Sequence, residues 1–186
     1  MEPILIVVLV AVLIPVIWWI AVFNRITNLK NTTEESWSDI DVELKRRYDL
    51  IPNLVETVKG YAKHEQETLE RVVALRDVAM GNRGSAESQG RDESQLGLAM
   101  KTLFAVAEGY PELKSDANFR VLQEELAITE DRIAAARRFF NGNVRDLRNI
   151  LQSFPTSVVG GAMNVTEPTF FELEDDSERV VPRVDV

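Results

Sequence analysis

Few residues of this sequence have the type and spacing that metal binding requires. The single histidine, His64, stands between Lys63 and Glu65, with Glu67 close behind. A metal site needs several ligands that converge on one point, commonly histidines together with carboxylates. A lone histidine where a helix starts is usually a cap or a surface residue. We therefore expect no metal ligand set around His64.

Paired carboxylates such as Glu124 and Glu125 can do acid–base chemistry or hold a di-iron centre in a helical bundle. The di-iron pattern needs Glu-x-x-His on two helices, and one histidine cannot supply it. The chain has no cysteine, which excludes thiol nucleophiles and disulfides. No phosphate-binding loop and no Ser-His-Asp set is present. We expect no enzymatic activity, no catalytic residue and no cofactor.

A dense block of alternating charge follows Trp37. It is either a solvated helix face with local ion pairs or an intermolecular contact that sets the register between copies of the chain. The second interpretation makes a set of residues candidates for self-association: Asp39, Asp41, Glu43, Arg46, Arg47 and Asp49.

The overall charge limits the class of partner. The 186 residues carry a formal net charge of −9 and have a pI near 4.8. Nucleic-acid binding needs a basic face to meet the phosphates, so we expect no nucleic-acid partner.

The first residues predict a membrane anchor, assigned to residues 1–24. The run from Ile4 to Phe23 has no charged or polar side chain apart from the tryptophan indoles. Twenty helical residues span about 30 Å, the thickness of the hydrocarbon core of a bilayer. A cleaved signal peptide is the alternative, but the run is long and no small-residue cleavage site follows it. The residues that mark the anchor are Ile4, Val10, Pro15, Trp18, Trp19 and Phe23.

Flanking charge predicts the orientation of this anchor. No lysine or arginine precedes the apolar run, whereas Arg25 and Lys30 follow it. By the positive-inside rule, a single-pass protein in the cell membrane would hold its soluble domain in the cytoplasm.

An all-α bundle is predicted for residues 25–155. Apolar residues recur every three or four positions from Trp37 to Ala62, which is one face of a helix. Pro52 lies inside this helix and predicts a bend, because proline cannot donate to the carbonyl four residues earlier. Nothing between Phe23 and Trp37 demands a break. Whether the membrane helix continues into the bundle is therefore left open.

Three further helices complete the predicted antiparallel bundle of about four. The second helix has Leu69, Val72, Val73 and Met80 on its apolar face, and the Gly- and Ser-rich stretch from Gly81 to Ser94 is expected to be a loop. A third helix is predicted from about Glu93 to Ala107. The fourth is the longest, with an apolar stripe from Phe119 to Phe154 whose mean period is about 3.5, typical of coiled coils and bundles. Residues 156–186 are expected to form an acidic, mobile tail.

Two blocks of this sequence closely resemble the LemA family. The first is WSDIDVELKRR from Trp37, continued by DLIPNLVETVKGYAKHE from Asp49, and the second runs from Asn118 to Asn141. The ending PRVDV is also similar to that of the family. The resemblance implies a membrane-anchored antiparallel helical bundle. One member of the family is associated with forming magnetosome membranes, which by analogy implies a role in membrane organisation.

These observations lead to two functional hypotheses. In the first, the chain is a non-enzymatic scaffold: the bilayer holds the anchor, and the bundle self-associates as a homo-oligomer that organises or shapes the membrane. In the second, it is a membrane-tethered adaptor or regulator that recruits another protein, such as a membrane protease or signalling enzyme. The apolar stripes do not separate the two hypotheses.

Overall fold

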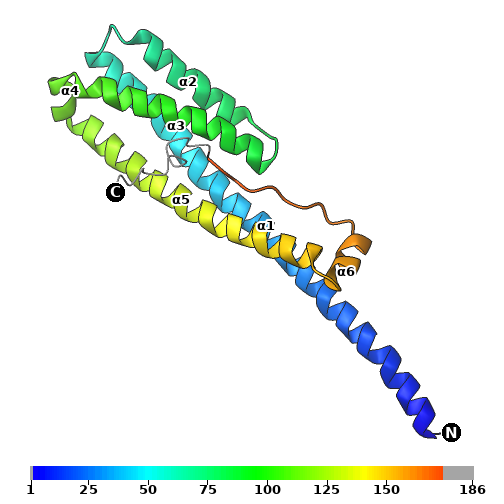
Figure 1. Cartoon of the computed structure of the whole chain (residues 1–186). Coiled ribbons are helices and arrows are strands. Elements are labelled where there is room, and N and C mark those ends of the chain that lie inside the picture. Colours follow the sequence, from blue (N-terminus) through cyan, green and yellow to red (C-terminus); the bar gives the residue numbers. More distant parts are fainter. Residues whose placement is uncertain (1, 174–186) are drawn as a thin grey trace, which may run out of the picture. The chain divides into compact units, whose positions relative to one another are not determined.

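The computed structural model describes residues 2–173, and every element in this range is a helix (Figure 1). This confirms the all-α class with long first and last principal helices. Two short helices that were not predicted, α4 and α6, flank the last long one. The elements are α1 (Glu2–Tyr61), α2 (Gln66–Gly81), α3 (Ala86–Glu108), α4 (Pro111–Ser115), α5 (Ala117–Gln152) and α6 (Thr156–Ala162).

Helix α1 is continuous from Glu2 to Tyr61, so the apolar run and the first bundle helix are one element. The polar stretch between them contains hydroxyl residues, which often favour caps or turns over helix interiors. Their hydroxyls instead donate to backbone carbonyls one turn earlier: Thr33 to Leu29 at 2.7 Å and Ser36 to Thr33 at 2.9 Å. These bonds are internal to the helix, so the polar stretch does not interrupt it.

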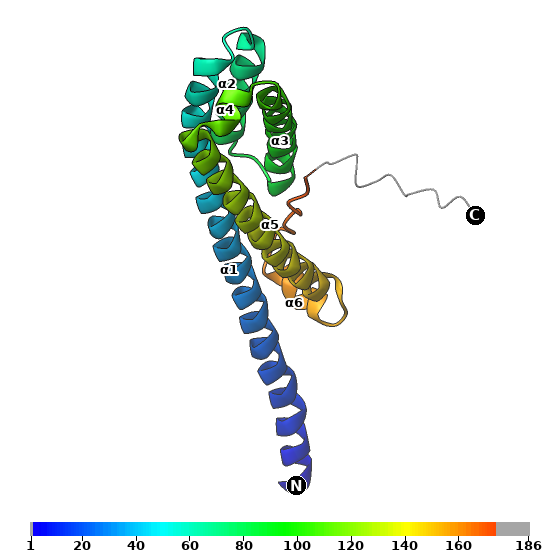
Figure 2. The same cartoon turned by 90° about the vertical axis from the view of Figure 1, so that its left-hand side faces the viewer.

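The chain divides into two compact units. The first contains the residues up to Ser38 together with Arg138–Pro168, and the second contains Asp39–Arg137 together with the segment from Thr169. In the second unit α2 and α3 lie side by side (Figures 1 and 2). Phe104 of α3 and Phe119 of α5 form an edge-on aromatic pair, with ring centroids 6.4 Å apart.

The first unit joins the N-terminal part of α1 to the end of α5. Trp37 packs on Phe140 with ring centroids 5.2 Å apart, and Asn143 donates to the Ser36 hydroxyl at 3.1 Å. Because residue numbers rise on one helix as they fall on the other, the two segments run antiparallel. A second apolar cluster in this unit has four buried members: Val22, Ile26, Leu147 and Val159.

Side-chain caps fix where two of the helices begin. The Ser85 hydroxyl accepts from the Ser88 backbone N–H at 3.2 Å, and α3 starts at Ala86. Residues 86–94, expected to be loop, are therefore helical, because the cap and the buried Gln89 and Glu93 outweigh the low helix propensity of glycine and serine. Asp116 caps α5 in the same way, accepting from the Phe119 N–H at 2.8 Å.

The predicted stripe of α5 is buried along most of its length. Phe119, Leu126, Ile133 and Phe140 are each less than 5% exposed. Phe154 is the exception: the stripe included it, but its side chain is 86% exposed. The prediction for Phe154 was wrong because α5 ends at Gln152, so the helical periodicity no longer sets the direction of that side chain.

The segment after residue 155 was expected to be a mobile tail, but much of its described part is packed. It forms α6, whose Val159 is fully buried, and it then places Phe171 at 0% exposure. A Cβ built on Gly90 of α3 would lie 2.1 Å from the Glu172 carbonyl oxygen, so the two backbones are in close contact. The buried Phe171 side chain thus fixes the described end of this segment against α3. Residues 174–186, including the rest of the predicted tail, lie outside the described residues.

Candidate functional site

The charged block on α1 separates into inward-facing and outward-facing members. Arg47 is only 3% exposed and pairs with Glu93 of α3 and with Glu130 of α5, the latter at 2.7 Å. Arg47 therefore has no surface to offer a second chain, which removes it as a self-association residue. Its burial reflects its position on α1, one turn before the buried Ile51. Three of the other candidates are exposed: Asp39, Asp41 and Asp49.

The remaining two candidates, Glu43 and Arg46, join α1 to α5. The Arg46 guanidinium lies 2.7 Å from the Glu125 carboxylate, with both side chains more than a third exposed. Glu43 faces Arg132 at 3.7 Å. These pairs are local contacts within one chain, and at this exposure each contributes at most about 1 kcal/mol.

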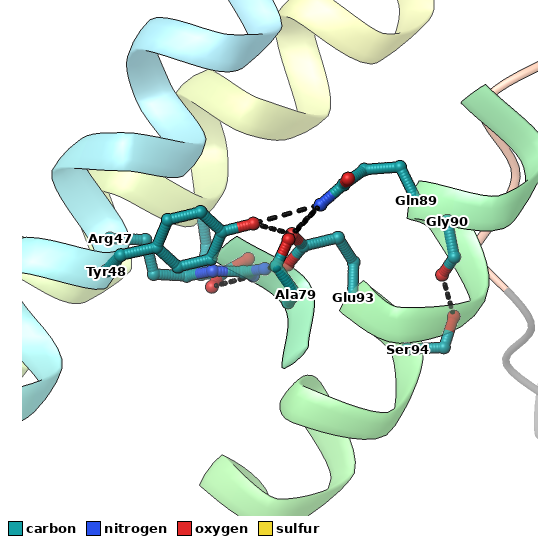
Figure 3. A network of polar contacts seen from close by, with 8 residues as sticks. Arg47, Tyr48, Ala79, Gln89, Gly90, Glu93 and Ser94 are labelled. Carbon is teal, nitrogen blue, oxygen red and sulfur yellow. Dashed lines mark hydrogen bonds and ion pairs between the residues drawn. The ribbon is translucent and has the colours of Figure 1, made fainter. Parts of the chain in front are cut away.

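Arg47 belongs to a buried polar network that draws on all four principal helices of the second unit (Figure 3). The Glu93 carboxylate forms an ion pair with the Arg47 guanidinium and accepts a hydrogen bond from the Tyr48 hydroxyl. The Gln89 amide nitrogen lies 2.8 Å from the Glu93 carboxylate and 3.0 Å from the Ala79 carbonyl of α2. These contacts give most of the buried polar groups a partner, although the Nε of Arg47 is buried without a hydrogen bond.

The electrostatics of this network keep Tyr48 protonated. Burial raises the pKa of Tyr48 to about 12, against the opposing effect of the Arg47 charge. At neutral pH the phenol is therefore a hydrogen-bond donor, as its contact with the Glu93 carboxylate requires. The Arg47 guanidinium, the Tyr48 hydroxyl and the Gln89 amide thus all converge on the Glu93 carboxylate.

Pro52 has a specific role beside the network. As a proline it cannot donate a hydrogen bond to the carbonyl of Tyr48, four residues earlier in α1. The guanidinium of Arg76, on α2, donates to that carbonyl instead, with Nε 2.8 Å from the oxygen. The predicted bend at Pro52 stays a prediction, but the proline opens a backbone acceptor through which α2 binds α1.

This arrangement predicts a thermodynamic coupling between Pro52 and Arg76. In the natural sequence Arg76→Ala should cost about 1–3 kcal/mol, because it leaves the Tyr48 carbonyl without its partner. In a Pro52→Ala background the restored N–H takes that carbonyl, so Arg76→Ala should cost about 1 kcal/mol less. Chemical denaturation of the four proteins in a double-mutant cycle measures the difference. Additive effects would contradict the proposed role of Pro52.

The network is suited to holding helices together, because most of its side chains are buried. Arg47, Tyr48, Gln89 and Glu93 are all at most 7% exposed. His64 lies on the surface in the turn between α1 and α2. Among residues 2–173, no group of three or more His, Asp or Glu side chains is placed to hold a metal ion.

Two surface features of the second unit remain. Val42, Val121 and Ile128 are exposed apolar side chains, at 66%, 59% and 37%. Val42 is one turn from Arg46, and Val121 and Ile128 are each one turn from Glu125. These side chains therefore flank the ion pair that joins α1 to α5, and we call this surface the α1/α5 seam.

The other feature is an open groove of about 570 Å³ between the end of α1 and α2. Val55, Leu69 and Val73 provide apolar lining, and the charged lining has both signs, with Lys59 and Lys63 as well as Glu70 and Asp77. The groove therefore has the composition of a surface that binds an apolar side chain flanked by polar or charged groups.

Comparison with known proteins identifies the family. The sequence model of the LemA family matches residues 36–186, which is most of the chain. The chain belongs to the LemA family. It is also similar to Protein LemA of Metamycoplasma hominis, with 23% identity over 163 residues that cover 88% of this chain and 72% of the relative.

LemA membership supports a membrane-associated protein. The match starts at Ser36, so it includes the buried network but not the apolar run of α1. Sequence reasoning missed the LemA-matched residues Gln89 and Glu93, because Gln89 lies in the stretch expected to be loop and Glu93 at the expected start of the third helix. Their spacing of four, with a polar capping serine at Ser85, was the available signal for a helix.

Proposed function

We propose that this LemA chain is a non-enzymatic scaffold, anchored in the cell membrane by α1, whose helical bundle associates with further copies and organises or shapes the membrane. The proposal has two parts, an anchor and a self-associating surface. The exposed α1/α5 seam is the observation that carries it.

The anchor part rests on apolar surface that the chain itself does not cover. Helix α1 contains a stretch that is long and apolar enough to cross a membrane, and the rest of the chain buries none of its most apolar part. Val22, near the end of the run, is buried. Ile4 is 70% exposed and Val10 is 45% exposed. In water such a surface would be strongly unfavourable, whereas a bilayer covers it. Arg25 and Lys30 favour the cytoplasm for the residues that follow.

The self-association part rests on the seam. Apolar side chains grouped on the surface of a folded domain commonly mark a contact with another protein. The two ion pairs beside them carry both signs of charge, so an identical seam on a second copy offers complementary charge. A shared bilayer also holds all copies at one depth, which raises the effective concentration of one seam for another.

Substitution within the seam tests this proposal. The full-length protein in mild detergent is expected to have a mass well above that of a monomer. Ile128→Asp should shift it toward the monomer, because a carboxylate would be buried at the contact. Leu98→Asp, at a 57% exposed apolar position on α3, is the matched control and should leave the mass unchanged. Light scattering coupled to size-exclusion chromatography gives the masses.

Two results would count against the scaffold. A monomer over a wide concentration range, in lipid as well as in detergent, would exclude self-association. Equal effects of the two aspartate variants would show that the seam is not the contact. Circular dichroism checks that both variants keep their helix content.

The groove between α1 and α2 favours a second candidate, the membrane-tethered adaptor. Its apolar lining fits an apolar side chain of a partner segment. Its two lysines at the α1 end fit a neighbouring acidic residue, whereas Glu70 and Asp77 on α2 give the other side of the groove the opposite charge. Under this alternative the chain is a monomer, and Lys59→Glu with Lys63→Glu removes a captured partner while the mass of the chain is unaffected.

A further inference from the structure

The turn between α5 and α6 exposes apolar side chains. Phe154, at the turn, is 86% exposed, and Val158 of α6 is 55% exposed. The segment that carries both side chains is fixed, because α6 is packed against α5. A Cβ on Gly160 would lie only 2.7 Å from the Leu151 side chain. The buried Val159 holds the other side of α6 against the first unit. A fixed element thus directs Phe154 and Val158 outward.

The turn lies level with the end of the apolar run of α1. Trp37 packs on Phe140, and α1 and α5 are antiparallel from that contact onward. Phe154 comes about four helical turns after Phe140, and the same distance back along α1 from Trp37 leads to Phe23. Direct contacts agree with this register, since Trp18 and Val22 of α1 pack in one cluster with Val159 of α6.

The charge pattern around the turn is that of a membrane-contacting segment. No Asp, Glu, Lys or Arg lies between Arg148 and Glu167, in a chain of which 27% is charged. We call residues 149–166 the tip segment. Its two flanking charges meet, with the Arg148 guanidinium 3.3 Å from the Glu167 carboxylate. The charges are therefore confined to the base of the tip segment, and apolar side chains occupy its end.

We propose that the tip segment inserts Phe154 and Val158 into the interfacial region of the bilayer that α1 spans. This inference rests on the anchor proposed above, which sets the level of the membrane boundary near Trp18 and Phe23. Aromatic and apolar side chains on a short helix are favourable at this depth, about 5–10 Å into the boundary between headgroups and acyl chains. A shallow insertion beside a spanning helix adds area to one leaflet only, which is a means of shaping a membrane.

Depth-dependent fluorescence quenching tests the insertion. The full chain has no cysteine, so single cysteines can carry an environment-sensitive dye at chosen positions. Three variants suffice: Val158→Cys in the tip segment, Val10→Cys in the anchor and Leu98→Cys as an exposed control in the second unit, away from the α1/α5 seam. Each is reconstituted into phosphatidylcholine vesicles with lipids brominated at shallow or deep acyl positions. Aqueous iodide is the opposing quencher.

We expect shallow bromines to quench the dye at residue 158 about twofold more than the dye at residue 98, with the reverse order for iodide. Deep bromines should quench the dye at residue 10. Quenching at residue 10 without quenching at residue 158 would overturn the tip proposal alone. No lipid quenching at residue 10 would overturn the anchor, and the tip proposal with it. Protection of residue 158 from iodide without lipid quenching would overturn the proposal in favour of a protein contact.

The dye is itself apolar, so a further variant separates its effect from that of the chain. The label at residue 158 is measured again with Phe154→Asp, an exposed change that should leave helix content unaltered. If the side chains of the tip segment carry the insertion, lipid quenching at residue 158 should fall by about half or more. Unchanged quenching would mean that the dye alone enters the bilayer, and would overturn the proposal.

Discussion

Arg47→Ala is expected to lower the free energy of unfolding by about 3–5 kcal/mol, because it leaves the Glu93 carboxylate buried without its cation. Glu93 is 2% exposed, so water cannot replace the guanidinium without opening the bundle. The neighbouring Arg46→Ala is the matched control. Its pair with Glu125 is on the surface and should be worth less than about 1 kcal/mol. Guanidinium denaturation of the full chain in a nonionic detergent, followed by circular dichroism, measures both.

Removing both charges separates the penalty of an unpaired charge from the worth of the ion pair. A buried pair replaced by apolar side chains of similar size is often neutral or stabilising. Arg47→Met with Glu93→Leu should therefore recover about half or more of the loss caused by Arg47→Ala. Equal costs for Arg46→Ala and Arg47→Ala would mean that Arg47 is hydrated and that the network contributes little. A double variant no better than Arg47→Ala would show that packing, not charge, dominates at this site.

The contrast between these two arginines explains why the network was not predictable. Adjacent positions on a helix point about 100° apart, so one can face the core while the next faces solvent. The sequence shows a run of charge without showing which residue α3 will cover. The partners Gln89 and Glu93 were also hidden, because glycine and serine around them predict a loop and the cap at Ser85 reverses that outcome.

Periodicity predicted the parts of the fold that depend on it. The α5 stripe from Phe119 to Leu147 and the apolar run of α1 follow directly from spacing and composition. Helical periodicity predicts nothing where the chain leaves a helix. Phe154 continues the spacing but is exposed, and Phe171 has no spacing to predict its burial. Phe154 lies beyond the end of α5 at Gln152, and tertiary contacts, which local patterns do not encode, bury Phe171.

Phe171→Ala is the second change expected to have a large effect. The side chain is at 0% exposure, so its loss should leave a cavity and cost about 3–5 kcal/mol. Phe139→Ala makes the same chemical change at a position that is 58% exposed, and it should alter stability by no more than about 0.5 kcal/mol. Denaturation of the full chain in detergent compares them. Similar results for the two phenylalanines would show that the segment around Phe171 is not part of the stable fold.

Two glycines of α3, Gly90 and Gly97, test whether the segment around Phe171 packs against that helix. Glycine inside a helix is destabilising by roughly 0.5–1 kcal/mol relative to alanine, so Gly97→Ala, with nothing within 4 Å of the added methyl group, should stabilise the chain. Gly90→Ala should do the opposite, because its methyl group would lie 2.1 Å from the Glu172 carbonyl oxygen and displace the segment that holds Phe171. In a Phe171→Ala background that segment is already loosened, so Gly90→Ala should lose most of its effect. If Gly90→Ala stabilised the natural sequence as Gly97→Ala does, the C-terminal segment would not be docked on α3.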